Sequence, residues 1–254
     1  MAEIKVWGGT HPDEKAALAV VDSLFERPIP HVTPGIANQR ARELGRRFVD
    51  VNLVGAFPGD SAAQEYERCR AVEVLAESEG YDAVIDLHNI NAYGENTACI
   101  DQNRGVNRRV LGFLAQLGIG HLIKTDYDGV QKYVPNTFVL ETLASGLGRD
   151  IEKLRDAFDG LANDPGLPEA ATDDFQWFRH LGSPNISKVS PDIIGPGLRR
   201  RLQGFDILPE EIAVALGYPD REVCLMAWRD VPNPYGYWGE LCEPIAVLEA
   251  PDCN

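Results

Sequence analysis

The chain has 254 residues and a formal net charge of −15 at pH 7, which argues against nucleic acid as a partner because its phosphates would be repelled. Its hydrophobic content of 44% is ordinary for a soluble protein, and no apolar run approaches the roughly 18 residues that a membrane span needs. Five cysteines without a CxxC pair argue against a disulfide scaffold and a thiolate zinc site, and the first residues lack the features of a signal peptide. We therefore expect a cytoplasmic protein with no membrane partner.

The first predicted element is a short strand at residues 4–7, followed by the segment Gly8-Gly9-Thr10-His11-Pro12-Asp13-Glu14. The two glycines let the backbone turn sharply, which leaves His11 and Glu14 on the loop or helix start beyond the strand. A His and a Glu three positions apart can reach one ion, and imidazole nitrogen with carboxylate oxygen is a zinc-type donor set. Ordinary surface helices also carry this spacing, so further residues are needed to distinguish a metal site from a solvated helix face.

Apolar periodicity predicts a helix from residue 13 to about 25, which Pro28 and Pro30 end. A Pro-rich stretch at 29–36 leaves room for a short strand, residues 38–41 open a polar turn, and residues 46–53 partly alternate before a loop at 55–59. An amphipathic helix is predicted from Ser61, as its N-cap, to Gly80, as its C-terminal stop.

The buried run 83–85 predicts a second strand, whose carboxyl end carries Asp86, His88 and Asn89. In open α/β sheets, ligands bind beyond the carboxyl ends of the strands. If the two strands are parallel, His88 therefore reaches the same edge of the sheet as His11. Asp86 is either a partner that orients a metal ligand or a carboxylate that caps the strand end.

Further along the chain, helices are predicted at 107–117 and 151–161, and a strand at 137–142 carries Glu141 at its far end. The Pro/Gly-rich stretch 163–168 is the best candidate for a domain boundary, and beyond it short β-like runs follow at 222–228 and 245–248.

Together, His11, Glu14 and His88 supply two imidazoles and one carboxylate. Three protein ligands leave a fourth position for water, which is the arrangement of a catalytic rather than a structural zinc site. Glu141 is then the candidate general base that takes a proton from that water. We predict one zinc ion per chain.

Five motifs, GGTHPDE, NQRA, RRFVDVNLVGAFPG, DLHN and VLET, occur in the order seen in a known family. Over roughly residues 3 to 145, and more weakly to the end, the chain resembles the aspartoacylase/succinylglutamate desuccinylase family, relatives of the zinc carboxypeptidases. The resemblance implies an α/β fold: a zinc-hydrolase catalytic domain (1–163), with a zinc-carboxypeptidase-like mixed sheet flanked by helices, and a smaller, mostly β C-terminal domain (169–254). It also implies a deacylase that hydrolyses the amide bond of an N-acyl amino acid.

The resemblance also implies roles for individual residues. His11, Glu14 and His88 match the metal ligands, Glu141 matches the acid/base, and Arg47 matches the arginine that polarises the scissile carbonyl. The predicted substrate-binding residues are Asn38 and Arg40, from the stretch that matches the family's Asn-Pro-Arg-Ala, and Tyr235, from a C-terminal loop that closes over the substrate, with Tyr237 close behind.

One departure concerns substrate recognition. The family's Asn-Arg pair, which grips the α-carboxylate of the substrate, is replaced here by Val54 and Gly55, and no bidentate contact to a carboxylate can come from these two residues. Lys132 lies where relatives carry a further substrate-binding arginine; Arg104, Arg108 and Arg109 are alternatives, although a solvated helix face accounts for them more simply.

Several alternatives stay open. The altered pair also fits a metal-binding pseudoenzyme, or a ligand-binding protein without turnover, whereas a peptide carboxypeptidase would need the missing arginine. His31, His121 and His180 are interpreted as loop, structural and packed histidines. A small-molecule substrate is the expected partner, and the substrate's identity, the native metal and homo-oligomer formation are left open.

Overall fold

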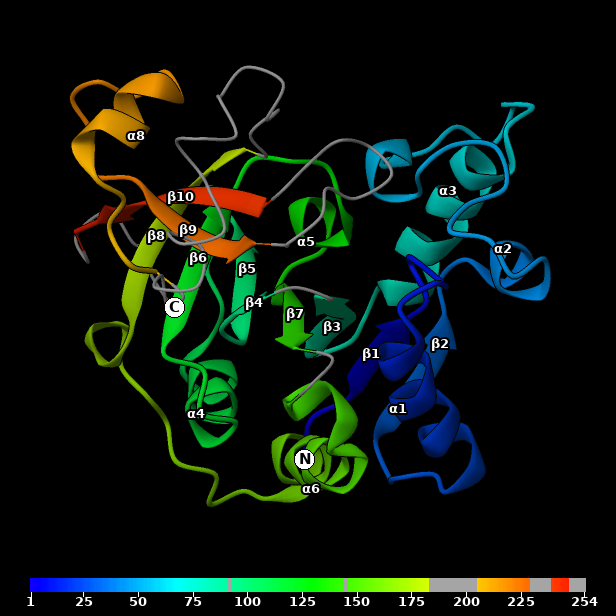
Figure 1. Cartoon of the computed structure of the whole chain (residues 1–254). Helices are drawn as coiled ribbons and strands as arrows, with labels where there is room; N and C mark the ends of the chain where they lie inside the picture. The colour runs from blue at the N-terminus through cyan, green and yellow to red at the C-terminus, as the bar shows by residue number, and fades with distance from the viewer. Residues whose placement is uncertain (91–92, 144–145, 183–204, 229–238, 247–254) are drawn as a thin grey trace.

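In the computed structural model, residues 1–90, 93–143, 146–182, 205–228 and 239–246 are described. Within these ranges ten strands form one mixed sheet that helices flank, as the sequence predicts (Figure 1). The strands are β1 (Ile4–Gly8), β2 (Val32–Ile36), β3 (Ala83–Ile90), β4 (Tyr93–Gly94), β5 (Thr97–Asp101), β6 (His121–Thr125), β7 (Thr137–Leu143), β8 (Gln176–Gly182), β9 (Cys224–Trp228) and β10 (Gly239–Ile245).

The sheet has the strand order β2-β1-β3-β7-β5-β6-β8-β10-β9-β4. Strands β2, β1, β3 and β7 run parallel to one another, so their carboxyl ends meet at one edge. Strand β5 runs antiparallel to β7 and parallel to β6. This edge of β1, β3 and β7 is where the sequence places the candidate ligands, and the predicted parallel pairing of β1 with β3 is confirmed.

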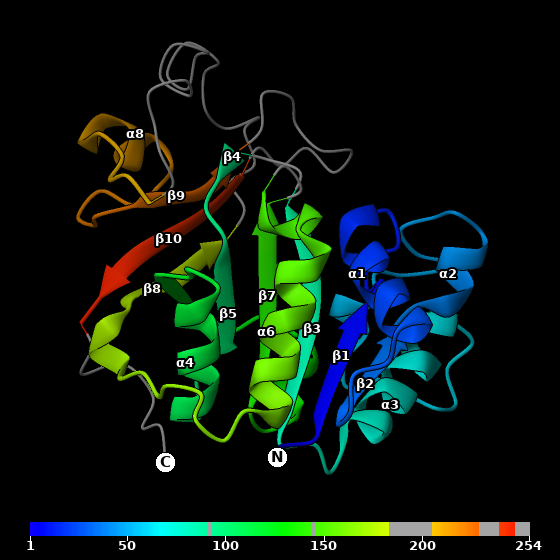
Figure 2. The ribbon, with the colours of Figure 1, turned by 90° about the horizontal axis from the view of Figure 1, so that it is seen from below.

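Helices cover both faces of the sheet. Their bounds are α1 (Lys15–Glu26), α2 (Gln39–Glu43), α3 (Tyr66–Ser78), α4 (Arg108–Gln116), α5 (Val130–Tyr133), α6 (Ile151–Asn163) and α8 (Glu210–Ala215), with short 3-10 helices η1 (Val54–Ala56), η2 (Leu147–Arg149) and η3 (Thr172–Asp174). Figure 2 shows α4 and α6 in front of the strands on one of the two faces.

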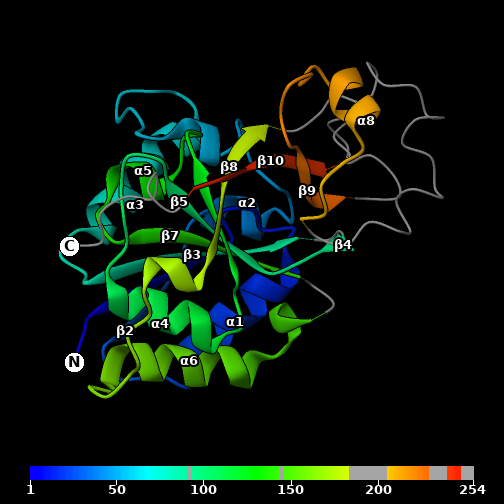
Figure 3. The same ribbon diagram turned by 90° about the vertical axis from the view of Figure 1, so that its left-hand side faces the viewer.

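Helices α1, α4 and α6 pack on one face, where their apolar side chains and those of the strands form a core that includes Val21, Phe113, Phe138 and Phe158. Helices α3 and α5 pack on the other face, in a second core around Trp7. Figure 3 shows the two layers from the side, with α4 and α6 on one side of β3 and β7 and α3 and α5 on the other. Burial of these apolar faces is the main force that holds the layers together.

Gly8, the last residue of β1, and Gly9, which follows it, are glycines for different reasons. A Cβ at Gly8 would lie 2.6 Å from Val21 Cγ2, so α1 can pack on the strand only because no side chain is present. Gly9 has a φ of +70°, which is the left-handed conformation that glycine adopts without strain. The sharp turn expected here is therefore confirmed, and it delivers His11 to the carboxyl edge.

The helix predicted from Ser61 begins only at Tyr66, so the proposed N-cap is wrong. Residues before it form a turn in which Asp60 Oδ1 accepts from the N–H of Ala62, while Asp50 Oδ2 accepts from the N–H of Tyr66 at 2.8 Å. A side chain from a distant loop thus caps the helix. Gly80, with a φ of +83°, follows the helix end as predicted.

The C-terminal strands do not form a separate sheet in the described ranges. Strand β8 pairs with β6, and β10 and β9 follow it, so the large sheet continues into the part of the chain predicted to be mostly β. The strand predicted at 222–228 is present as β9, whereas β10 ends at Ile245, before most of the run predicted at 245–248. The division into domains at 163–168 stays a prediction.

Candidate metal centre and active site

The loop after β1 and the carboxyl end of β3 bring His11, Glu14 and His88 together. One ligand atom from each residue lies within 4.8 Å of those of the other two, and this group is the one in the described ranges that could hold a metal ion. The two imidazole rings are 5.0 Å apart, centroid to centroid, and stand edge to face at 80°. Both histidines are buried. The convergence predicted from three distant side chains is therefore present.

Each imidazole turns one nitrogen inward and has the other held by an oxygen. Glu14 Oε1 lies 2.9 Å from Nδ1 of His11, and its Oε2 lies 3.1 Å from Nδ1 of His88. The outer nitrogens lie 3.0 Å from Oδ1 of Asn52, for His11, and 3.1 Å from Oδ2 of Asp86, for His88.

With a metal ion bound at the two Nδ1 atoms, the oxygen acceptors at Nε2 would hold the remaining proton of each ring there. Two such imidazoles and a carboxylate form a donor set that fits zinc and other divalent transition metals. Thr10 Oγ1 donates to Asp86 Oδ1 at 2.8 Å, so the carboxylate that contacts His88 is itself held in place. Asp86 is thus a partner of a candidate ligand, the first of the two interpretations that the sequence allows.

The electrostatics of the group favour a cation. Burial acts to raise the pKa of Glu14, but the neighbouring His88 holds it well below its usual range. Burial also acts to lower the pKa of His88, yet the charge of Asp86, followed by that of Glu14, holds it well above its usual range. Two carboxylates around one buried space therefore attract positive charge strongly.

Arg47 lies against the same group. Its Nη2 is 2.9 Å from His11 Nδ1, and its Nη1 donates to Asp13 Oδ1 at 2.9 Å and to Glu14 Oε1 at 3.4 Å. The guanidinium is therefore fixed at the rim of the centre, where the resemblance places a cation. Asp13 is the exposed carboxylate that pairs with it.

Glu141 stands directly beside His88, because the two residues pair in the register of β7 with β3. It also lies opposite Thr97 of the antiparallel β5. Burial raises the pKa of Glu141 to about 7, with His88 lowering it and the charges of Glu14 and Asp86 raising it. A carboxyl group with such a pKa can accept and release a proton near neutral pH.

The four predicted substrate-binding residues have different surroundings. The amide of Asn38 is fully buried and engaged, since Oδ1 accepts from the N–H of Ala41 and Nδ2 donates to Glu67, so direct contact with a substrate stays a prediction. Arg40 packs over the ring of Tyr66, and Lys132 pairs with Asp128 at 2.8 Å. Tyr235 and Tyr237 lie outside the described residues.

Val54 and Gly55, which replace the family's clamp, lie in η1. Of the alternative arginines, Arg104 and Arg108 stay predictions, whereas the contacts of Arg109 lie elsewhere. Arg109 donates to the carbonyl oxygens of Gly160, Leu161 and Asp164, and so ties α4 to the end of α6. Its guanidinium is used within the fold.

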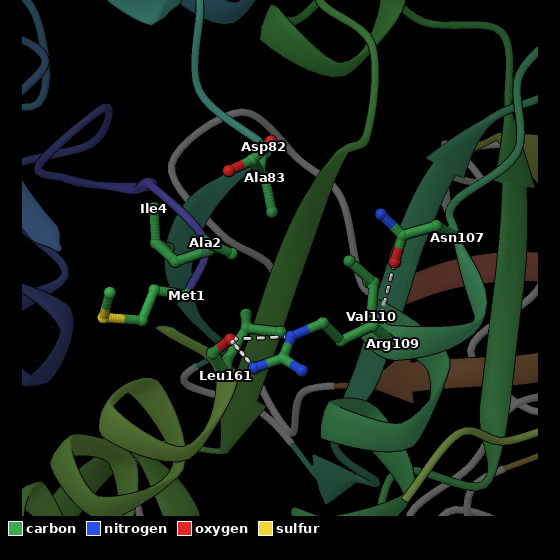
Figure 4. Close-up of a pocket in the computed structure, with 9 residues that line it drawn as sticks. All are labelled: Met1, Ala2, Ile4, Asp82, Ala83, Asn107, Arg109, Val110 and Leu161. Carbon is green, nitrogen blue, oxygen red and sulfur yellow. Dashed lines mark hydrogen bonds between the residues drawn. The ribbon is translucent and has the colours of Figure 1, made fainter. Parts of the chain in front are cut away.

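A pocket of about 260 Å³ lies at the opposite edge of the sheet, beside the first residues of β1 and β3 (Figure 4). Its polar side chains are already paired: Arg109 with the carbonyl of Leu161, Asn107 with the N–H of Val110, and Asp82 with the N–H of Glu3. The polar groups of this pocket therefore serve the packing of the fold, and the pocket is not part of the candidate centre.

No role was predicted from the sequence for two residues near the centre. Asn52 holds His11, and Asn89 joins β3 to α1, because its Oδ1 accepts from the N–H of Ala17 while its own N–H donates to Glu14 Oε2 at 3.0 Å. Asn89 follows His88 in the DLHN motif, which is a signal that could have been used. Asn52 is 41 residues from His11, and nothing in its local pattern indicates the contact.

The sequence is similar to that of a known protein family. Residues 2–143 match the model of the succinylglutamate desuccinylase/aspartoacylase catalytic domain, and this match spans more than half of the chain. The chain belongs to this family. A family relative from Prochlorococcus marinus (strain MIT 9313), described as a probable aspartoacylase, is 26% identical over 261 positions, which cover 91% of this chain and 86% of the relative.

Solved structures of the family share the fold. Succinylglutamate desuccinylase from Chromobacterium violaceum superimposes with a TM-score of 0.66 at 21% identity, over 96% of this chain and 85% of that one. Murine aminoacylase 3 does so with a TM-score of 0.67 at 16% identity, over 96% and 95%. None of the helices in the described ranges is both long and apolar enough to cross a membrane.

Proposed function

We propose that the protein is a zinc-dependent amidohydrolase acting on linear amides, a deacylase that cleaves the amide bond of a small N-acyl amino acid or a related amide. The observation that carries the proposal is the convergence of His11, Glu14 and His88 at one sheet edge, with Glu141 on the adjacent strand. Membership of the family supports it. The names of the relatives, aspartoacylase and succinylglutamate desuccinylase, suggest the substrate class.

His11, Glu14 and His88 would hold one zinc ion per chain through two Nδ1 atoms and a carboxylate oxygen. Zinc bound there would supply a Lewis acid that lowers the pKa of water and polarises the amide carbonyl. Asn52 and Asp86 keep the two imidazoles in the tautomer that this role needs.

Glu141 would act as the general base and then as the general acid. Its carboxylate takes a proton from the attacking water, whose oxygen bonds to the carbonyl carbon. The same carboxyl group then protonates the nitrogen as the C–N bond breaks, and the second proton of the water passes from the new carboxylic acid to the amine, so that a carboxylate and an ammonium ion leave. The pKa of Glu141, raised to about 7 by burial, suits both steps.

Arg47 would stabilise the negative charge that develops on the carbonyl oxygen. It is a fixed cation, because Asp13 and Glu14 hold its Nη1 at the rim of the centre. Preorganised positive charge of this kind favours the transition state over the bound substrate. Asn38, Arg40, Lys132 and Tyr235 stay the proposed substrate-binding residues.

Ligand binding without turnover is the second candidate function. One observation favours it: Val54 and Gly55 stand where the family grips the substrate carboxylate, and they form a short 3-10 helix with no charged group of its own. The placement of Arg47 and Glu141 around the centre supports catalysis instead, since binding alone would need neither an acid/base nor an oxyanion partner.

Metal content and a substrate panel separate the two candidates. We expect the zinc-loaded protein to hold one zinc per chain, His11→Ala to lose it, and His31→Ala, which alters a histidine paired with Glu3 away from the centre, to retain it. A panel of N-acyl amino acids and uncharged amides would then be tested at low and high salt.

Glu141→Gln is expected to keep its zinc and lose activity by about 10²- to 10⁴-fold, whereas Glu169→Gln, at an exposed position, keeps both. Stoichiometric zinc without turnover of any amide would favour the binding protein. Failure of the wild-type protein to bind zinc would contradict the metal centre itself.

A further inference from the structure

The carboxylate of Glu67 is fully buried at the start of α3. It lies on the inward face of this helix together with Ala71, Val74 and Ser78. A charged group removed from water is costly unless it is well hydrogen-bonded, so its partners indicate what the carboxylate holds in place. None of the ion pairs in the described ranges includes Glu67, and its partners are N–H groups instead.

Four N–H groups donate to this one carboxylate. Oε1 accepts from the backbone N–H of Val49 at 2.5 Å and from Nδ2 of Asn38 at 3.1 Å. Oε2 accepts from the backbone N–H groups of Asp50 and Val51, at 3.0 and 3.2 Å. Residues 46–53 form neither helix nor strand, so Glu67 supplies the acceptors that regular structure would otherwise provide.

The segment held by Glu67 lies between two residues that contact the metal centre. Arg47 precedes it and Asn52 follows it, and the two side chains contact opposite nitrogens of His11, at 2.9 and 3.0 Å. The same carboxylate fastens Asn38, whose backbone N–H donates to the carbonyl of Gly9, two residues before His11. Glu67 therefore joins both chain segments that border this ligand.

From this geometry we infer that Glu67 is a positioning residue, which fixes residues 47–52 so that Asn52 orients His11 and Arg47 stays at the rim of the centre. Its effect on turnover depends on the proposed function. Its effect on zinc affinity and on the order of the segment does not.

Glu67→Gln is the sharpest variant. Each carboxylate oxygen receives two donors, so an amide group, whichever way it turns, sets its NH₂ against two N–H groups. We expect the backbone amides of Val49, Asp50 and Val51 to exchange with solvent at least about tenfold faster, while those of β3 keep their rates. Glu79→Gln, on an exposed residue at the opposite end of the same helix, is the control, and we expect it to leave both sets of exchange rates unchanged.

Zinc affinity, measured by competition with a chelator, tests the link to His11. Loss of a partner that orients a ligand typically weakens metal binding about 10- to 100-fold, and we expect a loss of about tenfold for Glu67→Gln and at least as much for Asn52→Ala. The double variant is expected to bind zinc as Asn52→Ala does, because Glu67 acts through Asn52. Losses that multiply in the double variant, or an unchanged affinity in Glu67→Gln, would overturn the inference.

With the amide found in the panel, Glu67→Gln is expected to lower kcat about tenfold or more with KM within about twofold, because Arg47 acts on the transition state. Unchanged kcat despite faster amide exchange would overturn the link to Arg47. If the wild-type protein turns over no amide, the proposed function fails, and the exchange and zinc measurements still decide the role of Glu67. If Glu67→Gln does not fold, Glu67→Asp is used instead, because it keeps the charge on a side chain that is one methylene shorter. We expect it to lower zinc affinity and kcat as well.

Discussion

At the scale of single residues, the candidate centre is defined by which atom each side chain presents. The two histidines are held by different oxygens, a neutral amide for His11 and a carboxylate for His88. A carboxylate partner makes an imidazole more basic than an amide partner does, so His88 is the stronger donor of the two. Both nevertheless present Nδ1, which is why one carboxylate, that of Glu14, can reach both.

Glu67 gives a prediction for acid stability. Burial acts to raise the pKa of Glu67, but the N–H groups of Val49, Asp50 and Val51, with Asn38, hold it below its usual range. A pKa that is lower in the folded than in the unfolded state means that the ionised form stabilises the fold. That contribution is fully present above the unfolded value of about 4.3 and is lost as the pH falls through the folded value.

We therefore expect the wild-type protein to be more stable than Glu67→Gln by a constant amount above about pH 5, and the gap to narrow as the pH falls below about 4. Urea unfolding of both proteins at a series of pH values measures the gap. Glu79→Gln should show no such narrowing relative to the wild-type protein. A gap that is independent of pH, or that widens in acid, contradicts an ionised Glu67 in the folded state.

At the scale of elements, glycines inside two helices have opposite roles. Gly112 lies in α4, where a Cβ would stand 1.7 Å from the carbonyl oxygen of Pro168. Gly160 lies in α6, where a Cβ would meet Gln116 and Leu167 only at ordinary contact distances of 3.8 and 3.9 Å. Gly112 permits a close approach of the backbone. Gly160 permits no such approach, and its greater conformational freedom in the unfolded chain destabilises the helix.

Substitution by alanine should therefore change stability in opposite directions. We expect Gly112→Ala to lower the free energy of unfolding by about 1–3 kcal/mol, since α4 must move away from Pro168. Gly160→Ala should raise it by about 0.5–1 kcal/mol. Urea unfolding of the two variants measures both. A Gly112→Ala protein as stable as the wild type would show that α4 does not pack this closely.

The loop at 46–53 shows how elements depend on one another. Asp50 accepts from the N–H of Tyr66 at the start of α3, while Glu67 in that same turn accepts from the N–H groups of the loop. Loop and helix start thus satisfy each other's backbone groups, in the way that a capping box does within a single helix. Neither is expected to keep its conformation without the other.

At the scale of the whole molecule, charge is the dominant feature. The chain has 39 carboxylates against 24 lysines and arginines. Repulsion among them opposes the compact state, and salt screens it, since the Debye length falls from about 10 Å at 0.1 M to about 3 Å at 1 M.

We expect the Tm at pH 7 to rise as sodium chloride increases from about 0.05 to 1 M, by roughly 2–4 °C for each kcal/mol of repulsion removed. Thermal unfolding followed by circular dichroism measures the rise. At pH 5 the net charge is closer to zero, so the effect of salt should be smaller. A Tm that stays constant or falls with salt at pH 7 would exclude charge repulsion as a limit on stability.

The sequence by itself determined most strands and helices of the N-terminal half and the residues of the candidate metal centre. The Gly8-Gly9 turn, the spacing of His11 and Glu14, and the strand that ends at His88 are local patterns, set by residues close together in the chain. Parallel pairing then brings the ends of β1 and β3 to one edge, and the register of β7 places Glu141 beside His88.

Only the tertiary structure decided how these groups are held. The start of α3 at Tyr66, the contact of Asn52 with His11, and the burial of Glu67 depend on partners from other segments of the chain. The buried face of α3 includes Glu67 at helical spacing from Ala71 and Val74, but a sequence pattern cannot distinguish a buried, hydrogen-bonded carboxylate from a solvated one. The physical reason is that local propensity reflects near neighbours, whereas the orientation of a side chain depends on hydrogen bonds that exist only once distant segments have packed together.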